Sequence, residues 1–239
     1  MPITPTPGIP PQGTVLPTVR LLAGTLRQAL IPENGGFRLA RVLPDGRQAD
    51  AGLAAVRVLG ADVLTPFVVN GLTLTAQDAA LIRTAVRAYP APQAPASEVS
   101  LWGVRDAALV RALAASGVDA TGWEGLAPAE SPARLLTLPW VAMAAELVRM
   151  TGAAPPFAEQ DVRAHLARRH LDVGRGLVRA LLRRDLLSAA RLARWLGPAD
   201  ARLTAPVLDY LEIAGTDDAR VTLETAITRR LMTGASPEA

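Results

Sequence analysis

The stretch PFAEQDVRAHLARRHLDVGRGLVRALLRRDLLSAARLARWLGPADAR, residues 156–202, decides the fold that the sequence predicts for the C-terminal half of the chain. Its apolar residues recur three and four positions apart, which is the period of an amphipathic helix. Gly197 and Gly215 are placed to end helices, since glycine adopts the backbone angles of a helix terminus without steric cost. This stretch and the residues after it predict four helices, at about 158–170, 172–184, 188–196 and 204–214.

Arginine is concentrated in the same stretch. Residues 163–202 include ten arginines and three acidic residues, whereas residues 203–239 include three arginines and six acidic residues. Arg175, Arg179 and Arg183 recur every four positions and therefore form one stripe on a helix. Like charges at this spacing destabilise a helix by about 0.2–0.5 kcal/mol per pair, so the stripe indicates an anionic partner, either phosphate or the chain itself.

The composition excludes several kinds of chemistry. The chain has 239 residues, all 25 of its Lys+Arg residues are arginine, and it has no cysteine. Lysine-dependent phosphate loops and Schiff bases, thiolate nucleophiles, disulfides and cysteine-ligated metals are therefore absent. The formal net charge is only +3. A lysine-free, arginine-rich composition is typical of a GC-rich genome, so the position of the arginines is more informative than their number.

The N-terminal part of the chain predicts a small α+β domain. Two apolar segments, Phe37–Leu43 and Ala55–Leu59, favour strands. A hairpin is predicted where 66–69 and 72–74 flank Asn70-Gly71, because both turn residues tolerate a positive φ.

Helices complete this part. The sequence Thr75-Ala76-Gln77-Asp78 is a capping-box pattern that predicts a helix to about Tyr89. An opening helix is expected at about Val19–Leu30.

Two segments rich in proline divide the chain. One is the N-terminus, and the other begins at Tyr89-Pro90. The expected organisation is a Pro-rich arm (1–17), a small α+β domain (18–89), a Pro/Ala-rich linker (90–97) and a larger helical domain (98–239). We expect neither a signal peptide nor a membrane-spanning segment or membrane partner, and a cytoplasmic location.

Catalytic motifs are missing from the sequence. His165 and His170 are five residues apart, which separates them by about 140° on a helix, so they cannot share one metal ion as an i,i+4 pair does. No serine lies in a G-x-S-x-G elbow, and Gly174-x-Gly176 lacks the strand and third glycine of a dinucleotide site. By elimination, we expect a protein that is not an enzyme and has no cofactor and no metal.

A region of about 40 residues, ~187–225, carries a resemblance. Residues 192–197, LARWLG, resemble the end of the first helix and the turn of a winged helix-turn-helix DNA-binding domain. Residues 208–215, LDYLEIAG, resemble the end of its recognition helix. The resemblance implies a wing at Thr216–Leu223 and a winged-helix core at ~157–235. Because that recognition helix carries Asp209 and Glu212, it offers few donors to base edges.

Two functions follow from the arginine cluster. The first is a non-enzymatic nucleic-acid-binding or regulatory protein that binds duplex DNA through its backbone, where guanidinium groups hold phosphates bidentately. The residues predicted to do so are Arg168, Arg169, Arg175, Arg179, Arg183, Arg184, Arg191, Arg194 and Arg202.

The alternative is a protein-interaction or assembly subunit with a helical oligomerisation domain and no nucleic-acid contact. In that reading the partner is a second copy or another protein, and Trp195 is a candidate surface anchor. A further interpretation of the cluster is that Asp172 and the acidic C-terminal block neutralise the arginines inside the chain.

Overall fold

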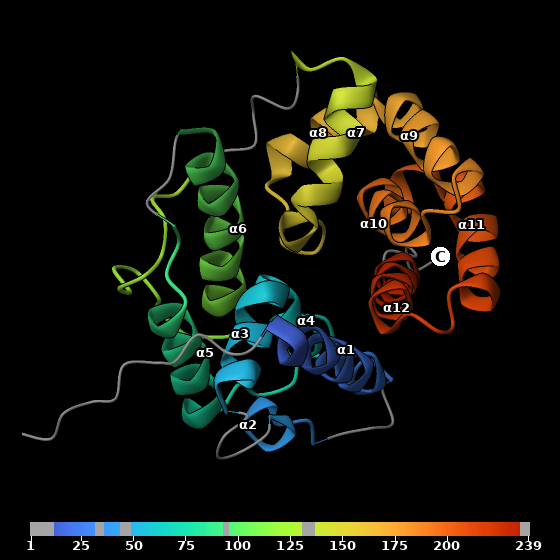
Figure 1. The fold of residues 1–239 in the computed structure, drawn as a ribbon. Coiled ribbons are helices and arrows are strands. Elements are labelled where there is room, and N and C mark those ends of the chain that lie inside the picture. The colour runs from blue at the N-terminus through green and yellow to red at the C-terminus, as the bar shows by residue number, and fades with distance from the viewer. Residues whose placement is uncertain (1–11, 32–35, 44–48, 93–95, 131–136, 235–239) are drawn as a thin grey trace, which may run out of the picture.

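The computed structural model describes residues 12–31, 36–43, 49–92, 96–130 and 137–234 (Figure 1). Within those ranges the chain forms helices and short 3-10 turns and no strand. The longer helices are α1 Gln12–Ala29, α3 Ala49–Leu59, α5 Ala76–Ala88, α6 Ala96–Ala115, α7 Trp140–Arg149, α8 Gln160–Arg168, α9 His170–Leu182, α10 Leu186–Leu196, α11 Ala201–Ala214 and α12 Ala219–Gly234. The shorter elements are α2 Leu39–Val42, η2 Gly60–Leu64, α4 Thr65–Val69, η4 Thr151–Ala153 and η5 Gly197–Asp200.

The prediction of an α+β fold with an N-terminal α+β domain is wrong, because every segment predicted as a strand and described by the structure is helical or irregular. Phe37–Leu43 contains α2, Ala55–Leu59 is the second half of α3, and 66–69 lies in α4. Short apolar runs of this kind are compatible with a buried strand or with a buried helix, and periodicity alone does not separate them.

The Asn70-Gly71 pair ends a helix instead of joining two strands. The Asn70 amide donates to Pro66 O at 3.2 Å, which closes α4, and Gly71 follows with φ +65°. The Asn70 side chain donates to Ala29 O at 3.0 Å and so ties α4 to the end of α1. A positive φ serves a helix terminus as well as a hairpin turn.

The helical predictions agree closely with the structure. Thr75 and Asp78 form the expected capping box, with Asp78 N donating to Thr75 Oγ1 at 3.2 Å. Gly197 and Gly215 end α10 and α11, as predicted. The periodic stretch that opens at residue 156 forms α8, α9 and α10, and α11 follows it.

A single continuous cluster of buried apolar residues joins the two sides of the 90–97 segment. It includes Leu22 of α1, Leu109 of α6 and Ile227 of α12. α1 packs on α3 and α12, and α6 packs on η2 (Figure 1). The predicted N-terminal and C-terminal parts therefore share one core.

A buried ion pair reinforces this junction. Arg57 of α3 donates to both carboxylate oxygens of Asp106 of α6, with Arg57 Nη2 2.9 Å from Asp106 Oδ2. Arg57 Nε also donates to Tyr89 O at 2.9 Å, and its guanidinium lies 4.5 Å from the Trp102 ring centroid. The planar fork of arginine matches a carboxylate in this bidentate geometry.

One segment, Ala49–Val69, is long and apolar enough to cross a membrane by length and composition. It contains the charged residues Arg57 and Asp62, and 72% of its most apolar window is buried against the rest of the chain. That degree of burial is also typical of a helix in a protein core.

Candidate functional site

α9 presents the predicted arginine stripe on the surface. Its other face is buried against α7 and α10, where a Cβ on Gly176 would lie 2.6 Å from the Ala144 Cβ. This close approach fixes the rotation of α9, so that Arg175, Arg179 and Arg183 are exposed.

Apolar side chains lie on the same exposed face. The side chains of Leu171, Val178 and Leu182 share one side of the helix, because they are separated by seven and four residues. Leu182 is 82% exposed and Leu171 is 66% exposed. They line a groove of about 710 Å³ together with Trp140 of α7 and Leu203 of α11.

Trp140 also positions an arginine. The Arg179 guanidinium lies 6.0 Å from the centroid of the Trp140 ring, which is within reach of a cation–π attraction. A second, shallower groove of about 370 Å³ lies on the other side of Arg179 and Arg183, between α7, α9 and α10. The two arginines therefore form a charged ridge between two partly apolar grooves.

Most of the arginines that the sequence assigned to nucleic acid are accessible. Arg168, Arg175, Arg179, Arg183, Arg184 and Arg202 are exposed. Asp172 neutralises part of the cluster, as the internal alternative predicted: it lies 2.8 Å from Arg169 Nη2 and 3.1 Å from Arg175 Nη1.

Arg194 and Arg191 do not belong to this surface. Arg194 is 0% exposed, and its Nη1 lies 2.8 Å from Asp62 Oδ1 and 2.9 Å from Glu224 Oε2. Arg191 is mostly buried and lies 3.7 Å from Glu224 Oε1. Neither arginine therefore lies on the exposed surface predicted to meet a DNA backbone. Two carboxylates hold Arg194 in the interior, and Arg191 is largely buried beside Glu224.

Two further expectations of the sequence are also wrong. Trp195 is buried and donates its indole Nε1–H to Leu147 O at 2.9 Å, so it is not a surface anchor. The segment Thr216–Leu223, expected to form a wing, enters α12 at Ala219.

The exposed apolar part of the α9 surface was not predicted from the sequence. The signal in the sequence was that apolar residues cover a wide arc around the α9 helix. Positions 173, 177 and 180 already fill a buried face, so apolar residues at 171, 178 and 182 are in excess of what a core-facing helix needs.

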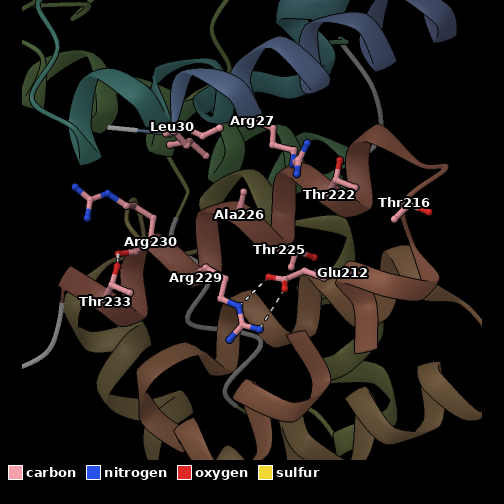
Figure 2. Close-up of a pocket in the computed structure, with 11 residues that line it drawn as sticks. Arg27, Leu30, Glu212, Thr216, Thr222, Thr225, Ala226, Arg229, Arg230 and Thr233 are labelled. Carbon is pink, nitrogen blue, oxygen red and sulfur yellow. Dashed lines mark hydrogen bonds and ion pairs between the residues drawn. The ribbon is translucent and has the colours of Figure 1, made fainter. Parts of the chain in front are cut away.

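Figure 2 shows a different cleft, of about 660 Å³, between α1, α11 and α12. Three of its charged groups, Glu212, Arg229 and Arg230, already have partners. Arg229 lies between Asp209 and Glu212, with Arg229 Nε 2.8 Å from Glu212 Oε1, and Arg230 Nε donates to Asn70 Oδ1 at 3.0 Å.

Three threonine hydroxyls of this cleft, those of Thr222, Thr225 and Thr233, donate to carbonyl oxygens of their own helix, as Thr225 does to Val221 O at 2.8 Å. The cleft therefore joins α11 to α12 and presents no nucleophile paired with a base.

No group of three or more metal-ligating side chains occurs in the part of the chain that the structure describes. Comparisons with known proteins found no matching family model, no matching curated protein and no matching solved structure. The resemblance to winged helix-turn-helix domains stays a prediction, and the surface itself has to carry the functional argument.

Proposed function

We propose that the protein is an assembly subunit that binds a second copy of itself, with the α9 groove of one copy receiving the outer face of α11 from the next. The observation that carries this proposal is the exposed leucine pair on α9, Leu171 and Leu182, set beside a row of arginines. The buried centre of a protein interface is more apolar than the rest of the surface, and arginine is enriched there.

The apolar residues favour a protein partner over duplex DNA. Binding to a phosphate backbone needs cations and hydrogen-bond donors, and it gains nothing from an exposed leucine. Fully burying one leucine side chain contributes roughly 1.5–3 kcal/mol, which a protein partner supplies and a phosphate backbone does not.

α11 offers the complementary surface on the same chain. Its outer face exposes Tyr210 and Ile213, and Ile213 is 79% exposed. Asp209 and Glu212 lie beside them and are exposed, with Arg229 as their shared ion-pair partner. Asp217 follows, so this end of α11 has a negative excess of two charges from three carboxylates and one arginine.

The two faces match in both charge and apolarity. The α9 ridge is positive and carries leucines, whereas the α11 face is negative and carries an isoleucine and a tyrosine. Two α9 faces repel each other, so an interface made from one face paired with itself is disfavoured. A contact between two different faces is head-to-tail, and it leads to a ring or to an open chain of subunits.

The test is the mass of the protein in solution over a wide concentration range, measured by sedimentation velocity. We expect the average mass to rise with concentration above the 25.1 kDa of one chain. Leu182→Glu on α9 and Ile213→Arg on α11 are each expected to reduce association by about tenfold or more, because each places a like charge in the contact.

Leu21→Glu is the matched control. Leu21 is an exposed leucine on α1, outside both faces, so this variant is expected to associate like the unmodified protein. A strictly monomeric protein at the highest concentration contradicts the proposal. A protein that stays monomeric but binds a DNA duplex, with an affinity that falls steeply with salt, assigns the arginine surface to nucleic acid instead.

A further inference from the structure

A small polar cavity lies between η2, α6, α10 and α12, away from the α9 surface. Its volume is about 150 Å³, which is room for roughly five water molecules at about 30 Å³ each. The charged groups that line it include Asp62, Arg105, Arg191, Arg220 and Glu224.

The two carboxylates of the cavity are already held by an arginine. Arg194 lies 2.8 Å from Asp62 and 2.9 Å from Glu224, and it is fully buried. Arg149 also lines the cavity, but its Nη1 lies 3.0 Å from Glu146 Oε1, which neutralises it. Counting the remaining Arg105, Arg191 and Arg220, together with Arg194, against Asp62 and Glu224 gives an excess of two positive charges.

Arg105 is fixed at the wall of the cavity without a carboxylate of its own. Its Nη2 donates to Val58 O at 2.7 Å, and its guanidinium stacks 4.9 Å from the centroid of Trp102. Among the described residues, no acidic oxygen forms an ion pair with it. Burial, and then the neighbouring Arg57, lower the pKa of Arg105.

Arg220 of α12 also lines the cavity without an ion-pair partner among the described residues. No carboxylate of the described chain forms an ion pair with it, and burial followed by the charge of Arg191 lowers the pKa of Arg220. Arg191 itself reaches Glu224 only at 3.7 Å, and its buried Nε has no hydrogen-bond acceptor in the described chain. Three guanidinium groups thus line one cavity, and within the described residues none of them has a carboxylate within hydrogen-bond distance.

We propose that this cavity binds a small oxyanion of the phosphate class, held by Arg105, Arg191 and Arg220. A tetrahedral oxyanion accepts charge-assisted hydrogen bonds from several guanidinium groups at once, and arginine is the side chain best shaped to donate them. The volume is sufficient for one phosphate group. The bound anion neutralises the excess charge and thereby stabilises the junction between α6, α10 and α12.

The experiment titrates the full-length protein with inorganic phosphate by calorimetry, and follows its thermal unfolding in phosphate against sodium chloride at equal ionic strength. We expect saturable binding and a rise in Tm in phosphate but not in chloride. Glycerol 3-phosphate is the second probe. Tighter binding of the monoester identifies the oxyanion as the headgroup of a larger ligand, and binding of phosphate alone identifies the free ion.

Arg220→Gln and Arg105→Gln are expected to weaken phosphate binding about tenfold or more, because each removes a charged donor. Arg202→Gln, at an exposed arginine outside the cavity, is the matched control and is expected to bind phosphate normally. Using two cavity variants guards against one of them failing to fold. The proposal is overturned if phosphate gives no more stabilisation than chloride, or if both cavity variants bind phosphate as Arg202→Gln does.

Discussion

The buried arginines and the arginines of α9 are in opposite environments, although every basic side chain of this lysine-free chain except its two histidines is an arginine. Arg57 and Arg194 are buried and hold carboxylates from distant helices, Asp106 in one case and Asp62 and Glu224 in the other. Arg179 and Arg183 extend from α9 into solvent with no carboxylate of the described chain as an ion-pair partner. The arginine content of the chain therefore cannot be assigned one role.

The energetic consequence of the contrast is large. A buried ion pair contributes little over a well-packed apolar pair, yet removing one partner leaves a desolvated charge behind. An exposed arginine is solvated before and after any change to its surroundings. Variants of the buried arginines should therefore change the free energy of unfolding, whereas variants of the α9 arginines should change the association of the protein.

The largest effect is expected for Arg194→Met. This change leaves Asp62 and Glu224 buried without their shared cation, and it should lower the free energy of unfolding by about 3–5 kcal/mol. Urea denaturation followed by circular dichroism measures the change. Arg202→Met, at an exposed position, is the control and should shift stability by no more than about 0.5 kcal/mol. Equal stability of the two variants would contradict the claim that the buried arginine stabilises the fold and the exposed one does not.

A smaller effect is expected for Glu224→Gln as a function of pH. Burial raises the pKa of Glu224 above its ordinary value of 4.5. A carboxyl group whose pKa is higher in the folded state contributes stability that is fully present below the unfolded value and is lost as pH rises through the folded value.

The unmodified protein should therefore lose stability relative to Glu224→Gln as the pH increases from about 4.5. Urea unfolding of both proteins over a pH series gives this difference. A difference that is constant with pH, or that grows in favour of the unmodified protein at higher pH, contradicts the raised pKa.

The smallest effect on stability is expected for the combined change of Arg175, Arg179 and Arg183 to Gln. Because these side chains are exposed, the free energy of unfolding should change by no more than about 0.5 kcal/mol per site. Self-association should weaken, and its dependence on salt should diminish, since the ridge supplies the positive charge of the contact. A stability loss as large as that of Arg194→Met would reveal that the ridge is structural.

The parts of the fold that the sequence predicted well are those where a local signal decides the structure. The capping box at Thr75 and the periodic stretch from residue 156 specify helices through neighbours three and four positions away. The N-terminal strands were mispredicted because the apolar run from Ala49 to Val69 is buried on nearly all sides, and burial of that kind removes the alternation that distinguishes a helix from a strand.

The candidate site was predicted only in part for a related reason. The positions of Arg175, Arg179 and Arg183 on one stripe follow from their spacing alone. The burial of Arg194 does not, because its carboxylates come from η2 and α12, on either side of it in the sequence. The excess of apolar residues on α9 can be read from the sequence. That Leu182 in particular is exposed depends on which faces of α9 are covered by α7 and α10 in the tertiary structure.

The most direct test of head-to-tail assembly is to mix the two face variants. Leu182→Glu keeps an intact α11 face, and Ile213→Arg keeps an intact α9 face, so each can supply what the other lacks. The mass of an equimolar mixture, measured by light scattering after size exclusion, decides the question. Head-to-tail assembly predicts that each variant alone associates more weakly than the unmodified protein and that the mixture associates more strongly than either variant alone, through the one pair of intact faces. A mixture that stays monomeric, at concentrations where the unmodified protein associates, contradicts it.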